Sequence, residues 1–118
     1  MNSSAKGKAL RLSPLKMRKV INLVRGKTVS EALFILKALP NKGAKMAYKV
    51  IFSAAANFKN KFPDQAEKEL KVEAIFADQA PVLRRMMPRA RGRADVLRKQ
   101  SCHLSVILGS IEEIKAER

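Results

Sequence analysis

The segment from Leu83 to Asp95 reads Leu-Arg-Arg-Met-Met-Pro-Arg-Ala-Arg-Gly-Arg-Ala-Asp. It holds five of the ten arginines of the chain, and Asp95 is its only acidic residue. Because guanidinium groups repel one another, an isolated domain gains little stability from such a cluster. Arginine pairs with phosphate through two parallel hydrogen bonds and stacks on bases. The segment therefore predicts a nucleic-acid partner.

The residues on both sides of this segment predict a long β-hairpin. From Leu70 apolar residues recur at every second position, which is the period of a strand. One face of this strand is expected to carry Leu70, Val72, Ala74 and Phe76. A second strand over residues 96–109 is expected to present Cys102, Leu104, Val106 and Leu108 on one face. If the two strands pair, the chain turns near Pro88–Gly92, and the arginine cluster occupies the tip.

The outer part of this hairpin is expected to project from the rest of the protein. Residues 78–85 and 93–99 lack the apolar alternation that would place them on a core. Arms of about eight residues at about 3.3 Å each would reach roughly 25 Å. A bare two-stranded arm is marginally stable in water, so we expect it to be mobile when free and ordered when bound.

The first half of the chain predicts helices. Ser13 and Pro14 are a typical N-cap and first helical residue, and apolar residues continue at helical spacing until Gly26. Before this helix, residues 5–12 fit a short strand only loosely.

Two further helices are expected. The second begins at a Ser30 cap and ends at the break before Pro40. The third covers about residues 42–60, and its alanine-rich stripe is expected to lie tightly against a sheet or another helix. That stripe consists of Ala44, Ala47, Ile51, Ala54, Ala55 and Phe58.

The charge of the chain agrees with a polyanionic partner. The formal net charge is +15 on 118 residues. Residues 1–66 carry fourteen basic and two acidic residues, whereas residues 67–118 carry eleven and eight. The basic surface is therefore broad, which favours contact with phosphate on several sides.

Length and composition indicate one small domain with a sizeable core, since 47% of the residues are hydrophobic. No apolar run is long enough to cross a bilayer, so membrane insertion is not expected. A single cysteine, Cys102, excludes an internal disulfide and is expected to be buried in its strand. Its neighbour His103 points to the opposite face of that strand, so we expect no metal site.

Five short stretches stand in order along the chain: Leu12-Ser13-Pro14-Leu15-Lys16-Met17-Arg18, Leu23-Val24-Arg25-Gly26-Lys27, Ser53-Ala54-Ala55-Ala56-Asn57, Met87-Pro88-Arg89-Ala90-Arg91-Gly92-Arg93-Ala94-Asp95 and Ser101-Cys102-His103-Leu104. Together they resemble the universal large-subunit ribosomal protein family twenty-two, bacterial type. The resemblance covers about residues 5–109, and its most specific part is the Pro-Arg-Ala-Arg-Gly-Arg-Ala element. Where the family often has Thr-Ser-His, this chain has Ser101-Cys102-His103.

The resemblance implies an α+β fold in which three helices pack on a small antiparallel sheet and a long extended β-hairpin projects from it. Residues 1–118 would form a single domain, with a globular part at about 5–78 and 99–110, the hairpin at about 79–98 and a solvated tail at 111–118. The globular part would sit on the outer surface of the large subunit near the mouth of the peptide exit tunnel. The hairpin would run inward through ribosomal RNA, and its tip would line the tunnel wall.

The implied role is a structural constituent of the large ribosomal subunit that binds rRNA and aids subunit assembly, with no enzymatic activity and no cofactor. The residues expected to bind rRNA are Lys6, Lys8, Arg11, Lys16, Arg18, Lys19, Arg25, Lys27, Arg84, Arg85, Arg89, Arg91, Arg93, Arg98 and Lys99. The residues expected to line the tunnel are Met86, Met87, Pro88, Arg89, Ala90, Arg91 and Gly92. Expected partners are large-subunit rRNA, neighbouring ribosomal proteins and the nascent polypeptide. No homo-oligomer is expected, and the location is cytoplasmic or the matrix or stroma of an organelle.

Other functional classes explain the sequence less well. A free basic nucleic-acid-binding regulator would use the same charge pattern, but the chain has no dimer signature and its basic residues spread over several faces. An enzyme is disfavoured because the sequence has no triad spacing, no phosphate-cradling glycine loop and no paired carboxylates. A cationic membrane-surface protein would need the apolar helix stripes that the core requires.

Overall fold

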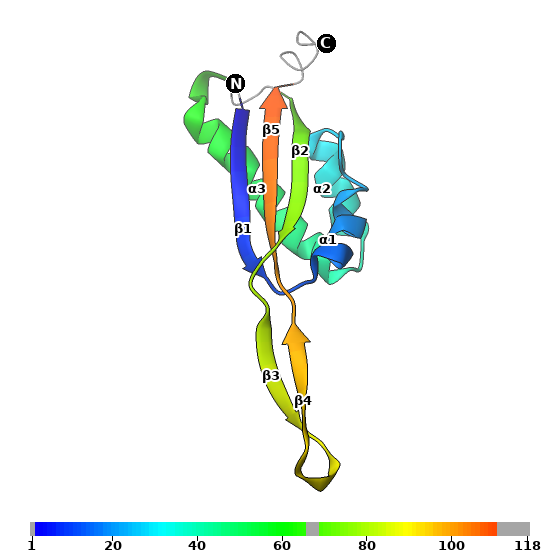
Figure 1. Cartoon of the computed structure of the whole chain (residues 1–118). Coiled ribbons are helices and arrows are strands. Elements are labelled where there is room, and N and C mark those ends of the chain that lie inside the picture. The colour runs from blue at the N-terminus through cyan, green and yellow to red at the C-terminus, as the bar shows by residue number, and fades with distance from the viewer. Residues whose placement is uncertain (1, 66–68, 111–118) are drawn as a thin grey trace.

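A three-stranded antiparallel sheet carries three helices on one face, and a two-stranded hairpin extends from one end of the sheet (Figure 1). This computed structural model describes residues 2–65 and 69–110, so the expected tail at 111–118 lies outside the described residues. The described elements are β1 (Asn2–Leu10), α1 (Pro14–Ile21), α2 (Val29–Ala38), α3 (Lys42–Lys61), a 3-10 turn (Pro63–Gln65), β2 (Leu70–Gln79), β3 (Leu83–Pro88), a second 3-10 turn (Ala90–Gly92), β4 (Ala94–Lys99) and β5 (Cys102–Ser110). The expected α+β class, with a long projecting hairpin, is confirmed.

The molecule is elongated, with principal extents of 66 × 25 × 24 Å. We call the sheet β1-β5-β2 with its helices the body, and β3, the tip turn and β4 the hairpin. The waist between them consists of residues 80–82 and 100–101. At the waist the Ala80 N–H donates to the Ser101 carbonyl at 3.0 Å, and the Ser101 hydroxyl donates to the Pro81 carbonyl at 3.1 Å.

The central strand β5 presents its apolar face to the helices, as the sequence predicts. Cys102, Leu104, Val106 and Leu108 are all fully buried. The expected single strand over residues 96–109 is, however, two strands, because the chain passes from β4 in the hairpin to β5 in the body at Gln100–Ser101. Because of this break, β5 pairs in the sheet of the body and β4 pairs with β3 in a separate two-stranded sheet.

The prediction of which β2 residues share one face is wrong beyond the third residue of the strand. Val72 pairs with Leu108, but Ala74 pairs with Ile107, so Glu73 is an extra residue that forms a β-bulge. Because side chains alternate with a period of two, one inserted residue moves every later side chain to the other face. The buried residues of β2 are therefore Leu70, Val72, Ile75 and Ala77 instead of Leu70, Val72, Ala74 and Phe76.

The first strand is longer than the short strand expected at residues 5–12. It begins at Asn2, pairs with β5 and ends at Leu10, with an irregularity between Gly7 and Leu10. Within this irregularity Ala9 has a left-handed backbone with φ of 52°. Its N–H donates to Nδ1 of His103 at 2.9 Å, so a side chain of β5 replaces the interrupted ladder bond.

Helix α1 begins as predicted and ends earlier than predicted. The Ser13 hydroxyl accepts a hydrogen bond from the Lys16 N–H at 3.4 Å, which makes Ser13 the N-cap. The helix ends at Ile21, and tight turns carry the chain on to Gly26, whose φ is +77°. Glycine adopts that left-handed conformation without the strain of a Cβ, so Gly26 ends the run of turns instead of the helix.

Helix α2 is capped by Thr28, not by Ser30 as expected. The Thr28 hydroxyl accepts from the Glu31 N–H at 3.3 Å, and Ser30 is already inside the helix. Thr28 and Glu31 have the spacing of a capping box, which places the cap three residues before the glutamate. The last helical residue is Ala38, two residues before the expected break at Pro40.

Helix α3 matches its predicted range closely and packs against the sheet. Its stripe is fully buried except for Ala55, which is half-buried. Gly43 lets the first turn approach closely, since a Cβ there would lie 2.8 Å from Cδ2 of Leu12. None of the helices within residues 2–65 and 69–110 is long and apolar enough to cross a membrane.

Two polar contacts fix α3 on β1. The buried Ser3 hydroxyl donates to the Ala54 carbonyl at 2.9 Å. Asn57 is exposed and donates through Nδ2 to the Ser4 carbonyl at 2.9 Å.

Candidate nucleic-acid interface

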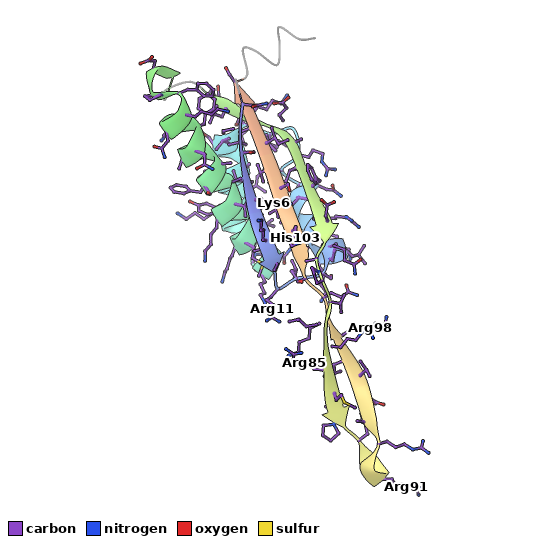
Figure 2. All side chains as sticks on the ribbon, turned by 60° about the vertical axis from the view of Figure 1, so that its left-hand side comes forward. Lys6, Arg11, Arg85, Arg91, Arg98 and His103 are labelled. Atoms are coloured by element: carbon purple, nitrogen blue, oxygen red, sulfur yellow. The ribbon has the colours of Figure 1, made fainter. Side chains whose placement is uncertain are left out.

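Within residues 2–65 and 69–110, the hairpin does not pack on any other part of the protein. Every residue from Arg84 to Gln100 is exposed. In Figure 2 the side chains of this segment point outward around the two strands, and Arg91 lies at the far end of the molecule. The arginines of the sequence cluster are therefore held away from the body and remain open to a partner on all sides.

The register of the hairpin separates its side chains into two faces. Arg84 stands opposite Arg98, and Met86 stands opposite Val96, on one face. Like charges directly opposite one another destabilise a strand pair, so the Arg84–Arg98 pair disfavours the free hairpin and favours an anion between the two side chains. The other face carries Arg85, Met87, Asp95 and Leu97.

The tip is a tight turn that holds its arginines in fixed directions. The Arg89 N–H donates to the Arg93 carbonyl across the turn. Arg91 and Gly92 both have left-handed backbones, with φ of 62° and 72°. A Cβ on Gly92 would meet nothing within 4 Å, so glycine is needed there for its backbone conformation and not for lack of space.

The single acid of the cluster closes the tip. Asp95 Oδ2 lies 2.7 Å from Nε of Arg89, and both side chains are about 60% exposed. A pair so open to water contributes at most about 1 kcal/mol. Four of the five cluster arginines have no such partner within residues 2–65 and 69–110.

The basic residues expected around the first helix divide into two groups. Lys16 and Lys19 are exposed, and Arg11 lies at the waist near Arg98 of the hairpin (Figure 2). Lys6 and Lys8 of β1 are exposed, and Lys6 pairs with Ser105 on the sheet face opposite the helices. The candidate interface therefore runs from the open sheet face through the waist to the hairpin tip.

Two expected RNA-binding arginines have partners within the protein. Arg18 donates through Nη2 to the Ala77 carbonyl at 3.0 Å, and Arg25 donates through Nη2 to the Ile75 carbonyl at 2.8 Å. These carbonyls belong to β2, an edge strand with unpaired acceptors. Arg18 and Arg25 thus cover the sheet edge, and the nearby Lys27 carbonyl accepts from the Val72 N–H.

An exposed aromatic surface on the helices was not predicted. Tyr48 and Phe52 of α3 stack with ring centroids 6.3 Å apart, and Phe34 of α2 is 77% exposed. The spacing of Tyr48 and Phe52 at i and i+4 was a readable signal for a shared helix face. Three lysines line a groove beside Tyr48, namely Lys37, Lys45 and Lys49.

The buried Cys102 is separate from this interface. Burial in the core raises the pKa of its thiol, because the thiolate would lose its hydration. Within residues 2–65 and 69–110 no three residues of the metal-ligating types come together.

Comparison with known proteins shows which family this chain belongs to. The family described as Ribosomal protein L22p/L17e matches residues 5–109. Among proteins named large ribosomal subunit protein uL22, that of Desulforamulus reducens is 47% identical over 113 residues, which cover 96% of this chain and 99% of that protein. That of Roseiflexus castenholzii is 48% identical (97% and 100% covered), and that of Thermus thermophilus is 45% identical (92% and 96% covered). A protein that matches these relatives over nearly its whole length, and that carries the same projecting arginine-rich hairpin as the resemblance implies, belongs to the L22p/L17e family of ribosomal proteins.

Proposed function

We propose that this chain is a structural constituent of the large ribosomal subunit, where it binds large-subunit rRNA and aids folding of that RNA. The observation that carries the proposal is the hairpin, which places six arginines and one aspartate on an arm whose residues 84–99 are all exposed. Such an arm gains stability only when an external polyanion surrounds it, since nothing in its own body neutralises or covers it.

The phosphate contacts are assigned to the cluster arginines and to the basic residues of the body. RNA folding brings phosphates close together although they repel one another. Arginines on both faces of the hairpin can bridge such phosphates. Residues 79–98 act as the RNA-inserted arm, and the body anchors it. Arg18 and Arg25 contribute to the interface mainly by fixing α1 and the turns after it to β2.

The tip is assigned to the wall of the peptide exit tunnel, with the nascent polypeptide as a transient partner. Met86 is 72% exposed and Met87 is 43% exposed near the end of the arm. Flexible, polarizable methionine side chains suit a surface that must accept many passing sequences. The remaining members of this lining are Pro88, Arg89, Ala90, Arg91 and Gly92.

Neighbouring ribosomal proteins are assigned to the helical side of the body. Phe34 on α2 and the stacked Tyr48 and Phe52 on α3 expose aromatic side chains there, and large aromatic side chains are enriched at protein interfaces. This side lies across the body from the open sheet face that carries Lys6.

The test is sedimentation of an extract that contains the tagged chain. We expect the chain to travel with the large subunit at low salt. A chain that stays at the top of the gradient would contradict ribosomal incorporation. A chain that travels with other nucleic acid instead would favour a free regulator.

A further inference from the structure

A hollow of about 550 Å³ lies at the waist, between the body and the base of the hairpin. Its lining contains four cationic side chains and no acidic one. The lining residues are Arg11, Leu12, Ser13, Lys16, Lys42, Arg98 and Gln100. So much positive charge around one concave space favours an anion within it.

The four cations come from four separate parts of the chain. Arg11 follows β1, Lys16 is in the first turn of α1, Lys42 is the first residue of α3, and Arg98 belongs to β4. Among the residues that the structure describes, none of these four side chains has an ion-pair or hydrogen-bond partner. Only the tertiary fold brings these four charges together.

Two of these cations stand at positions that destabilise the free protein. Lys16 and Lys42 occupy the first turns of α1 and α3, where the helix dipole favours an acidic side chain, and neither first turn contains one. Helix α2 shows the usual arrangement, with Glu31 in its first turn. Helices α1 and α3 therefore carry positive charge at the ends that face the hollow, and this charge would stabilise a bound anion.

The hollow also joins two parts of the molecule that few other bonds connect. Arg98 moves with the hairpin, whereas Arg11, Lys16 and Lys42 belong to the body. Figure 2 shows Arg11 and Arg98 near the narrow waist. An anion held by both groups would link the hairpin to the body.

We propose that this hollow binds a phosphodiester group of the RNA and thereby fixes the direction in which the hairpin leaves the body. The inference rests on the proposed function and adds to it a defined site, with Lys42 as a residue that the sequence did not single out. The two arginines supply forked donors for the phosphate oxygens, and the two lysines supply point charges. The volume admits the phosphate together with the adjoining sugars.

The first experiment compares Lys42→Gln with Lys45→Gln for binding to a large-subunit rRNA transcript over a series of salt concentrations. Lys45 is one turn further along α3 and borders a different groove. We expect Lys42→Gln to lower the log-log salt slope by about 0.7 to 0.9 and to weaken binding several-fold, while Lys45→Gln leaves both unchanged. The free Lys42→Gln variant should melt at the same temperature as the wild type or higher, because it removes an unfavourable charge from a helix start.

The outcomes separate the two proposals. Wild-type protein that fails to bind the transcript contradicts the proposed function. Wild-type protein that binds steeply with salt, together with Lys42 and Lys45 variants that behave alike, overturns the hollow and leaves the proposed function standing.

A second experiment measures the direction of the hairpin. Spin labels on cysteines introduced by Ala90→Cys at the tip and Lys59→Cys on α3, in a Cys102→Ser background, report the distance between hairpin and body. We expect the distance distribution to narrow when the transcript is added, and to narrow less when Lys42→Gln is also present. Equal narrowing in both proteins would show that the hollow does not set the direction.

Discussion

Leu104 and Leu97 are the same residue type, seven positions apart, in the two strands that follow the hairpin tip. Leu104 in β5 is fully buried under the helices, whereas Leu97 in β4 is 40% exposed on the hairpin. The body thus stabilises itself through a core, and the hairpin contributes almost nothing to that core. The comparison shows that one domain can combine a self-sufficient fold with a segment whose environment must come from outside.

The arginines of the body and those of the hairpin also differ in whether their partners lie within the protein. In the body, Arg18 and Arg25 use their donors on backbone carbonyls of β2. In the hairpin, Arg84 and Arg98 stand opposite each other with no acid between them. Arg18 and Arg25 therefore stabilise the body directly, whereas Arg84 and Arg98 stabilise only a complex.

Substitution in the core should have the largest effect on the free protein. Leu104→Ala is expected to lower the free energy of unfolding by about 2 to 5 kcal/mol, because it removes buried contacts and leaves a cavity. Leu97→Ala is the matched control and should stay within about 0.5 kcal/mol of the wild type. Urea unfolding followed by far-UV circular dichroism measures both. Equal losses of unfolding free energy in the two variants would mean that the hairpin unfolds together with the core.

Removal of the tip arginines should reverse this pattern. The triple variant Arg89→Ala, Arg91→Ala, Arg93→Ala is expected to weaken rRNA binding by at least about thirtyfold, or about 2 kcal/mol. Its log-log salt slope should fall by roughly 2 to 3, since three phosphate contacts are lost. Its unfolding free energy should remain within about 0.5 kcal/mol of the wild type.

The control for the tip is a triple alanine variant of Lys37, Lys45 and Lys49, which removes the same charge from the helices. Filter binding to the transcript at several salt concentrations measures all three proteins. If the helix variant loses as much affinity as the tip variant, net charge alone explains binding, and the hairpin has no special role.

A smaller effect is expected where arginine covers the sheet edge. Arg25→Ala removes hydrogen bonds to the Ile75 carbonyl and to Oδ1 of Asn22, both at 2.8 Å, and should cost about 1 kcal/mol of unfolding free energy. Lys19→Ala on the preceding helix α1 removes equal charge and should be nearly neutral. Chemical unfolding of the two variants tests this difference, and identical stabilities would show that the edge contacts contribute nothing.

The smallest effect should appear at alkaline pH. Burial raises the pKa of the Cys102 thiol above its ordinary value of 9.0, so the unfolded chain releases this proton at a lower pH than the folded protein. The folded state is therefore favoured below that value and loses this advantage as the pH rises, by at most about 0.8 kcal/mol at pH 9.5. Subtracting the pH profile of Cys102→Ala from that of the wild type isolates the thiol. A difference that stays constant from pH 7 to 10 would contradict this.

Local sequence patterns were sufficient to predict that three helices and a projecting hairpin exist. The Ser13 cap, the range of α3 and the buried face of β5 each depend on residues within a few positions of one another. Turn-forming Pro88 and Gly92 placed the tip for the same reason. The family resemblance also followed from contiguous motifs.

The features that the sequence patterns missed depend on contacts between residues that are distant in the chain. The bulge at Glu73 exists because β2 must stay in register with β5, and a period of two read along one strand does not reveal an inserted residue. The hydrogen bonds of Arg18 and Arg25 to carbonyls more than forty residues away were likewise not visible from charge alone. Thr28 is the exception, since its spacing from Glu31 was readable as a capping box.

By itself, the sequence determined that this protein has an α+β body and a polycationic hairpin that cannot bury itself. Periodicity and charge act over one or two turns of chain and need no knowledge of the fold. Only the tertiary structure decided which cations meet. Arg11 follows β1, Lys42 begins α3 and Arg98 belongs to β4, so they converge only when β1, α3 and the hairpin have packed at the waist. Contacts between distant residues are set by packing, and no local pattern encodes them.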